Sequence, residues 1–259
     1  MTLFEFDSRY REKKAIWRVL ELGPLRWGMP EGMIFRWYAA NLPMNLAPNS
    51  GFDGDIDLIA CLRKGRGVEA VWIYKTWEVK VALVDNQGRP RSLKAGKTSN
   101  LLTQLRKYRR FGCPDISLLE LYVCESGYFA AHTFPPKAVN DATRTRMAAL
   151  APESFGYHAL PFEHGTEGDA DVGLLVQGAA NPSAPTATPH LHSGRVKPAQ
   201  PFIGLMERIY EFAEDESENR KVRLGFCVVT YCYDCRKLLL LAMREQCTCY
   251  RCGRDLVSR

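Results

Sequence analysis

Two Cys-x-x-Cys motifs near the C-terminal end, thirteen residues apart, constrain the fold more than any other feature of the sequence. Each motif offers two thiolates to one ion, and two motifs complete the tetrahedron that is typical of a structural zinc site. Six of the nine cysteines fall within the last 33 residues, and this clustering favours metal binding over disulfides. The predicted Zn²⁺ ligands are Cys232, Cys235, Cys249 and Cys252.

This cysteine-rich tail resembles zinc-ribbon modules. Four thiolates leave no open coordination position, so the resemblance implies a structural ion rather than a catalytic one. Cys227 and Cys247 are not among the four predicted ligands. Each is either a small buried residue or a replacement for one of those ligands, for example Cys247 in place of Cys249. Residues 221–259 hold eight Arg or Lys against three acids, which suits a nucleic-acid clamp or a docking site for a partner protein.

Composition excludes several classes of protein. The first fourteen residues are charged and lack the apolar stretch of a signal peptide. No apolar run approaches the roughly 18 residues that a membrane span requires, so we expect a cytoplasmic protein with no membrane partner. A hydrophobic content of 46% is enough for one sizeable core and a small satellite domain.

Periodicity and turn residues predict an α/β fold with a mixed central sheet flanked by helices. Helices are expected over 8–22, 31–42, 100–111, 138–150 and 202–218, and strands over 56–61, 68–74, 77–83, 116–124, 128–133 and 157–161. Five prolines between 178 and 201 predict a linker or long loop. The predicted organisation is a main domain over 1–177, the linker 178–201, an acidic helix over 202–220 and the zinc module over 221–259.

Charged residues inside two apolar strands mark the candidate active site. Asp57 begins an apolar run, and burial of its carboxylate is costly unless a cation or partner offsets it. Strand alternation places Glu78 and Lys80 on one face, so pairing of these strands would bring two acids and one amine together. Two carboxylates suit Mg²⁺ or Mn²⁺, which activates a bound water for attack on a phosphate. Asp53 and Asp55 compete with Asp57 for the first ligand position.

The order of these motifs resembles the PD-(D/E)XK nuclease superfamily, and its RecB-like branch in particular. Gly54-x-Ile56-Asp57 is followed by Glu78-x-Lys80 and then by Gln104-x-x-x-Tyr108. The resemblance covers roughly residues 31–125 and implies a restriction-endonuclease-like core. It also implies that the two acids hold the metal and that Lys80 serves the attacking water. Gln104 and Tyr108 would orient the substrate or the lysine, and Glu31 is the available further acid.

A basic run accompanies the predicted site. Residues 88–110 contain eight Arg or Lys and no acid, which favours contact with a nucleic-acid backbone. These residues are Arg89, Arg91, Lys94, Lys97, Arg106, Lys107, Arg109 and Arg110. The sequence therefore predicts a Mg²⁺-dependent nuclease, with DNA favoured over RNA. The alternatives are a non-catalytic nucleic-acid-binding protein and an adaptor that uses the basic zinc ribbon.

Overall fold

The computed structural model has an α/β fold in which the strands form a mixed sheet flanked by helices. It describes residues 12–21, 34–64, 71–91, 98–125, 127–132, 136–164, 172–173, 200–243, 245 and 247–257. Two compact units divide the chain. Unit 1 comprises Met1–Gly28, Val79–Leu105 and Ser117–Leu191, and unit 2 comprises Met29–Glu78, Arg106–Ile116 and His192–Arg259.

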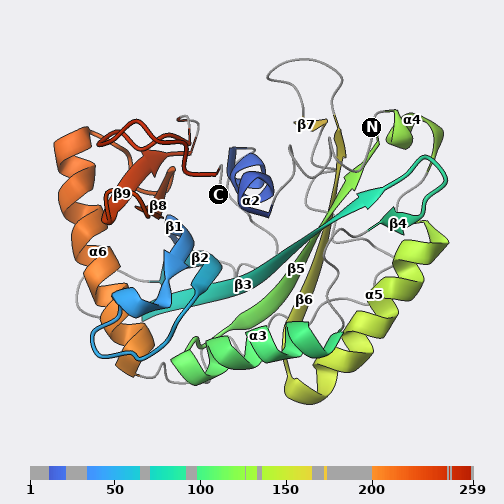
Figure 1. Cartoon of the computed structure of the whole chain (residues 1–259), viewed down its shortest axis with the longest axis horizontal. Coiled ribbons are helices and arrows are strands. Elements are labelled where there is room, and N and C mark those ends of the chain that lie inside the picture. The colour runs from blue at the N-terminus through green and yellow to red at the C-terminus, as the bar shows by residue number, and fades with distance from the viewer. Residues whose placement is uncertain are drawn as a thin grey trace. The chain divides into compact units, whose positions relative to one another are not determined.

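The strands of unit 2 follow the spatial order β3-β2-β1-β8-β9 (Figure 1). β1 pairs antiparallel with β2 and parallel with β8, and the pairs β2–β3 and β8–β9 are antiparallel. The tail strands β8 and β9 are thus continuous with strands from the first quarter of the chain. Their bounds are β1 Ile34–Pro43, β2 Asp55–Lys64, β3 Val71–Val84, β8 Cys227–Cys232 and β9 Lys237–Ala242, with a 3-10 turn at Met44–Leu46.

The helix predicted over 31–42 is wrong: residues from Ile34 onward form the strand β1. β1 has a neighbour on each side, and its residues from Trp37 to Pro43 are buried. A strand that is buried on both faces shows a continuous apolar run instead of alternation, and periodicity does not separate such a run from a buried helix. Tertiary pairing therefore decides the conformation of this segment.

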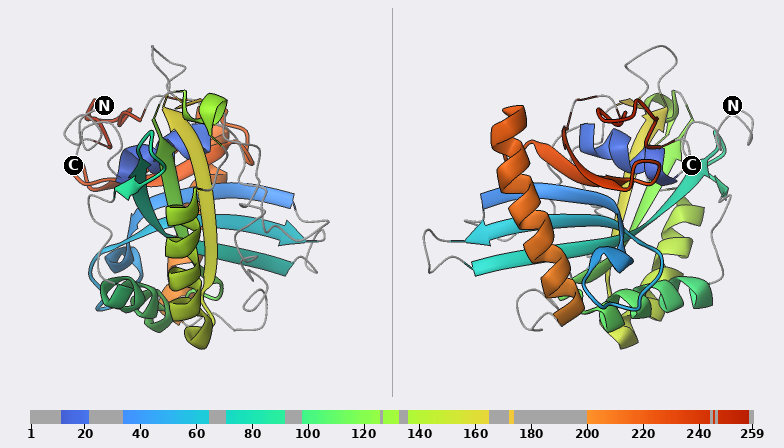
Figure 2. Two further views of the ribbon diagram at one scale, coloured as in Figure 1. Left: turned by 90° about the vertical axis from the view of Figure 1, so that its right-hand side faces the viewer. Right: turned by 60° about the vertical axis from the view of Figure 1, so that its left-hand side comes forward.

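The helix α6, Gln200–Arg220, lies across the strands of unit 2 (Figure 2). The helix predicted over 202–218 falls within it. Its ring contacts reach β3, where the ring centroids of Tyr74 and Phe202 are 5.4 Å apart. An Arg36–Glu214 ion pair of 2.6 Å joins the helix to β1. The buried face that covers the sheet consists of Phe202, Leu205, Met206, Ile209 and Ala213.

Unit 1 has its own strands and helices. β5 and β6 are parallel and α5 connects them, while β7 pairs antiparallel with β6 and β4 with the end of β3. Figure 2 shows α5 running alongside β6. The bounds are α2 Glu12–Glu21, β4 Pro90–Arg91, α3 Thr98–Phe111, β5 Ile116–Cys124, α4 Tyr128–Ala131, α5 Lys137–Leu150, a 3-10 turn at Ala151–Glu153, β6 Gly156–His164 and β7 Val172–Gly173. The chain segments of β3 and α3 contribute residues to both units.

Most of the elements predicted from periodicity are confirmed, with two further differences. The strands predicted over 68–74 and 77–83 are parts of the single strand β3. The strand predicted over 128–133 is the short helix α4, which begins after Gly127 at a φ of 79°. The predicted linker 178–201 lies outside the described residues as far as position 199.

A buried carboxylate anchors α5 to the sheet of unit 1. Glu120 on β5 accepts hydrogen bonds from the hydroxyls of Tyr122 at 2.8 Å and Tyr157 at 2.7 Å. The Arg146 guanidinium on α5 lies 3.1 Å from the other carboxylate oxygen. Burial, and then the charge of Glu120, raises the pKa of Tyr157, so its hydroxyl stays protonated and donates. This network holds α5 against the sheet of unit 1.

Unit 2 contains a nearly solvent-excluded ion pair, which gives a test of its packing. The Lys75 ammonium lies 3.1 Å from the Asp115 carboxylate, and the two side chains are 4% and 3% exposed. Lys75→Met should lower the free energy of unfolding by about 3–5 kcal/mol, because it leaves a buried carboxylate without its cation. Urea denaturation measures this loss. The double variant Lys75→Met/Asp115→Leu should recover most of it, and a double variant as unstable as the single one would contradict the pairing.

Candidate functional site

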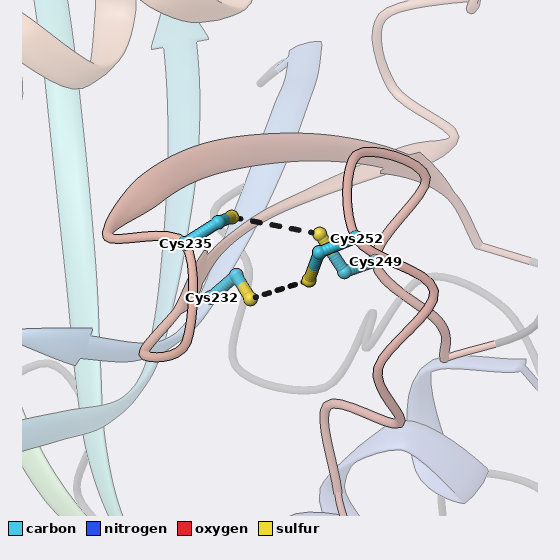
Figure 3. Close-up of side chains that lie close together, drawn as sticks. All are labelled: Cys232, Cys235, Cys249 and Cys252. Atoms are coloured by element: carbon cyan, nitrogen blue, oxygen red, sulfur yellow. Dashed lines mark hydrogen bonds between the residues drawn. The ribbon is translucent and has the colours of Figure 1, made fainter.

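The two Cys-x-x-Cys motifs meet in space at the end of the β8–β9 hairpin (Figure 3). Cys232 is the last residue of β8, and Cys235 lies in the turn that leads to β9. Cys249 and Cys252 come from a later loop, which a bridge between Thr248 and Asp255 closes. The four sulfur atoms lie within 4.8 Å of one another, so they could hold one metal ion.

The spacing of the sulfur atoms fits shared coordination and excludes disulfides. Cys232 and Cys252 are separated by 3.6 Å between sulfurs, and Cys235 and Cys249 by 3.7 Å. A disulfide requires about 2.05 Å. Tetrahedral ligation with zinc–sulfur bonds of about 2.3 Å separates neighbouring sulfurs by roughly 3.8 Å. The geometry therefore matches four ligands around one centre.

Electrostatics in the cysteine cluster favour a bound cation. Burial raises the pKa of Cys249, but the backbone N–H groups of Arg251 and Cys252 and nearby thiols outweigh burial and bring it to about 7. Burial and the adjacent thiols raise the pKa of Cys235 to about 12. Four thiolates this close repel one another, so full deprotonation requires a positive ion among them.

The two remaining tail cysteines lie outside the cluster. Cys227 is fully buried on β8 opposite Ala242, and burial raises the pKa of its thiol to about 12. The backbone carbonyl of Cys247 accepts a hydrogen bond from Leu256. Cys249, and not Cys247, belongs to the group of four. Spacing alone left this choice open.

Two carboxylates face each other on neighbouring strands of unit 2. In the antiparallel β2–β3 register Leu58–Trp77 is the last paired position, and Asp57 and Glu78 come directly beyond it on the two strands. Carboxylate oxygens of Asp57 and Glu78 lie within 4.8 Å of each other. Glu78 is only 3% exposed. Two like charges at this separation repel each other, so a cation between them would lower the cost of burying Glu78.

Tyr108 supports both acids from α3. Its side chain is 2% exposed, and its hydroxyl accepts the backbone N–H of Asp57 at 3.1 Å. Burial, followed by the charges of Asp57 and Glu78, raises its pKa well above the usual value, and the hydroxyl also hydrogen bonds to the Glu78 side chain. Tyr108 therefore stays neutral, and its hydrogen bonds position Asp57 and Glu78. Gln104, four residues earlier, is exposed on the helix.

Asp57 is the acid of the 53–57 segment that faces Glu78. Asp53 is exposed, and the hydroxyl of Tyr233 donates a hydrogen bond to the Asp55 carboxylate. Tyr233 lies between Cys232 and Cys235, so this bond joins the cysteine cluster to β2. The geometry thus separates the three aspartates that sequence alone left in competition.

Lys80 follows Glu78 by two residues on β3, and strand alternation places both on the same side. Its ammonium forms an ion pair of 2.7 Å with Glu12 and donates to the carbonyl of Val79 at 2.9 Å. Sequence reasoning missed Glu12, because nothing in the sequence distinguishes it from the other acids of its helix. Glu31, the predicted further acid, lies outside the described residues.

The basic residues predicted to contact nucleic acid have different surroundings. Arg106, Arg109 and Arg110 are exposed on α3, and Lys107 is half-buried on the same helix. Arg89 is held in an ion pair with Asp85 at 3.1 Å. The side chain of Arg91, together with Lys94 and Lys97, lies outside the described residues.

The cysteine cluster predicts one tightly held metal ion per chain. Cys249→Ser should lose this ion, because it removes one of four thiolates, whereas Cys247→Ser should retain it. Elemental mass spectrometry after dialysis against a weak chelator measures the metal. Equal loss from both variants would show that the ligand set is wrong.

Tyr108→Phe tests whether the Tyr108 hydroxyl stabilises the positions of Asp57 and Glu78. Loss of the hydroxyl removes its hydrogen bonds to Asp57 and Glu78, so the free energy of unfolding should fall by about 1–3 kcal/mol. Tyr210→Phe is the control, since the ring of Tyr210 packs on Trp72 in the same unit. Denaturant unfolding compares the two. A loss no larger for Tyr108→Phe than for the control would refute this role.

Comparison with known proteins gives no relative from which a function can be transferred. No protein-family model matches the chain, and neither a curated protein nor a solved structure matches it. Among the described residues, no helix is long and apolar enough to cross a membrane.

Proposed function

We propose that the chain is a Mg²⁺-dependent nuclease with a core of the PD-(D/E)XK type. One observation carries the proposal: carboxylate oxygens of Asp57 and of the buried Glu78 lie within 4.8 Å of each other on the adjacent strands β2 and β3. Lys80 follows on the same side of β3. A sheet that served only as scaffold would gain stability from apolar residues at these positions.

The two carboxylates supply the hard oxygen ligands that Mg²⁺ or Mn²⁺ prefers. A divalent ion bound there supplies a Lewis acid for the phosphodiester and lowers the pKa of a bound water. Asp57 and Glu78 hold the ion, and Tyr108 fixes both acids through its hydroxyl. Positioning of this kind accounts for most of what a protein must contribute to phosphodiester cleavage.

Lys80 is the cationic member of the proposed site. Its ammonium stabilises the negative charge that develops on the phosphate, or orients the attacking water. The ion pair with Glu12 restricts the direction in which the amine points. Glu12 thus acts through Lys80 as a positioning residue.

Nucleic acid is the proposed substrate, with DNA favoured over RNA. Support comes from three exposed arginines on α3, the helix that also carries Tyr108: Arg106, Arg109 and Arg110. Contacts from such residues go to phosphates and do not read sequence. Gln104, exposed on the same helix, is the further residue proposed to contact substrate.

We also propose that the cysteine cluster binds Zn²⁺ in a structural role. Four thiolates complete a tetrahedron and leave no position for water or substrate. The core around the ligands is small, consisting of Cys232, Leu239 and Cys249 with Cys235 and Leu256 packed against it. Metal binding therefore supplies folding free energy that this part of the chain lacks.

Cleavage assays test the proposed activity. The purified protein is incubated with linear, circular and single-stranded DNA and with RNA, in Mg²⁺, Mn²⁺ or EDTA. Cleavage should require the divalent ion, and Asp57→Asn, Glu78→Gln and Lys80→Ala should each reduce it by at least about 10²-fold, since a ligand or a charge-stabilising group is lost.

Asp53→Asn is the matched control, because Asp53 is an exposed acid four residues before Asp57. It should cut at the wild-type rate. Wild-type activity in Glu78→Gln or Lys80→Ala would overturn the assignment. Salt-sensitive binding without cutting would instead identify a nucleic-acid-binding protein, and neither activity would favour an adaptor that docks a partner through the ribbon.

A further inference from the structure

A basic pocket of about 340 Å³ lies beside the cysteine cluster in unit 2. Four cationic side chains line it, and no carboxylate is among the lining residues. The cations are Arg208, Arg236, Lys237 and Arg251, and the apolar wall includes Phe212 and Tyr231.

The metal-binding turns hold three of the four cations. Arg236 follows Cys235 directly and adopts a positive φ of 54°, which turns the chain into β9 at Lys237. Arg251 lies between Cys249 and Cys252. Two chain segments about fifteen residues apart thus present their cations to one hollow because their cysteines converge on one centre. Loss of the metal would disperse these charges.

The fourth cation comes from α6, and its position is also fixed. The Arg208 guanidinium donates to the backbone carbonyl of Leu46 at 3.2 Å, which accounts for only one of its five N–H donors. The Arg208 side chain is exposed. The helix and the hairpin therefore both contribute cations to the same pocket.

The residues that line the pocket carry a net positive charge, and a nearby acid offsets part of it. Glu216 lies 3.6 Å from Arg251 and offsets that charge in part. Arg251 also lies 5.5 Å from the centre of the Tyr250 ring. The lining itself contains no acid that could neutralise Arg208, Arg236 or Lys237. Convergent guanidinium and ammonium groups match the charge and hydrogen-bonding geometry of a phosphate group.

We propose that this pocket binds a phosphodiester of a nucleic-acid strand and so anchors substrate through the cysteine module. The choice of nucleic acid rests on the proposed nuclease function. The volume is at the small end for ligand sites, which suits one phosphate with part of its sugar or base. Tyr231 and Phe212 supply the apolar surface that such a sugar or base would contact.

The test measures binding of full-length Glu78→Gln protein, which should not cut, to a fluorescent oligonucleotide at several salt concentrations. Adding Arg208→Gln and Lys237→Gln removes two cations without changing a metal ligand. The slope of log affinity against log salt should fall in magnitude by roughly 1.4 to 1.8, and binding at 0.15 M salt should weaken about tenfold to thirtyfold.

Arg254→Gln is the matched control, because Arg254 is exposed on the same loop as Arg251 but lies outside the pocket. This variant should keep most of the affinity for the oligonucleotide. Equal weakening by the control, or an unchanged affinity in the pocket variant with its metal content retained, would overturn the proposal.

Inorganic phosphate as a competitor distinguishes a polymer from a free phosphate. If phosphate displaces the oligonucleotide only at phosphate concentrations far above the oligonucleotide concentration, the result supports a pocket that binds the polymer. Tight binding of phosphate to the pocket, with oligonucleotide affinity unaffected by the pocket variant, overturns it. Pocket-dependent binding by a wild-type protein that cuts nothing would uphold this inference and reject the nuclease.

Discussion

The opposition of Asp57 and Glu78 across β2 and β3 is the interaction on which the proposed chemistry depends. Two like charges whose oxygens lie within 4.8 Å of each other raise the free energy of the folded state, and burial of Glu78 increases that cost. The Tyr108 hydroxyl offsets part of it with hydrogen bonds. A divalent cation bound there would offset more of this cost, which is why the proposed function assigns the pair to a metal ion.

The cysteine module is built into unit 2 and is connected to the acidic strand. β8 pairs with β1, so the hairpin that carries the first two thiols continues the sheet to which β2 belongs. Tyr233, between Cys232 and Cys235, donates to the carboxylate of Asp55, while the backbone carbonyl of Asp55 accepts from Tyr108 at 3.4 Å. A metal ion bound by the cysteines would therefore order a turn that contacts the segment carrying Asp57.

Local signals in the sequence predicted much of the fold. The bounds of β5 agree with the predicted strand 116–124, and α5 and α6 contain the helices predicted there. Each has strong local determinants: an apolar run between turn residues, or apolar residues at helical spacing. The segment that forms β1 was predicted to be a helix, because burial on both faces removes the alternation that identifies a strand. Glu12 was missed for another reason, since its distinguishing contact is an ion pair with a residue 68 positions away.

The sequence by itself determined which chemical groups are available and how they are spaced along the chain. Two Cys-x-x-Cys pairs specify a metal-binding turn each, and strand alternation puts Glu78 and Lys80 on one side, because both relations are local. Only the tertiary structure decided that Asp57 rather than Asp55 faces Glu78, that Cys249 rather than Cys247 joins the cluster, and that four cations line one pocket. Strand register and loop closure set these relations, and both depend on contacts between residues that are distant in sequence.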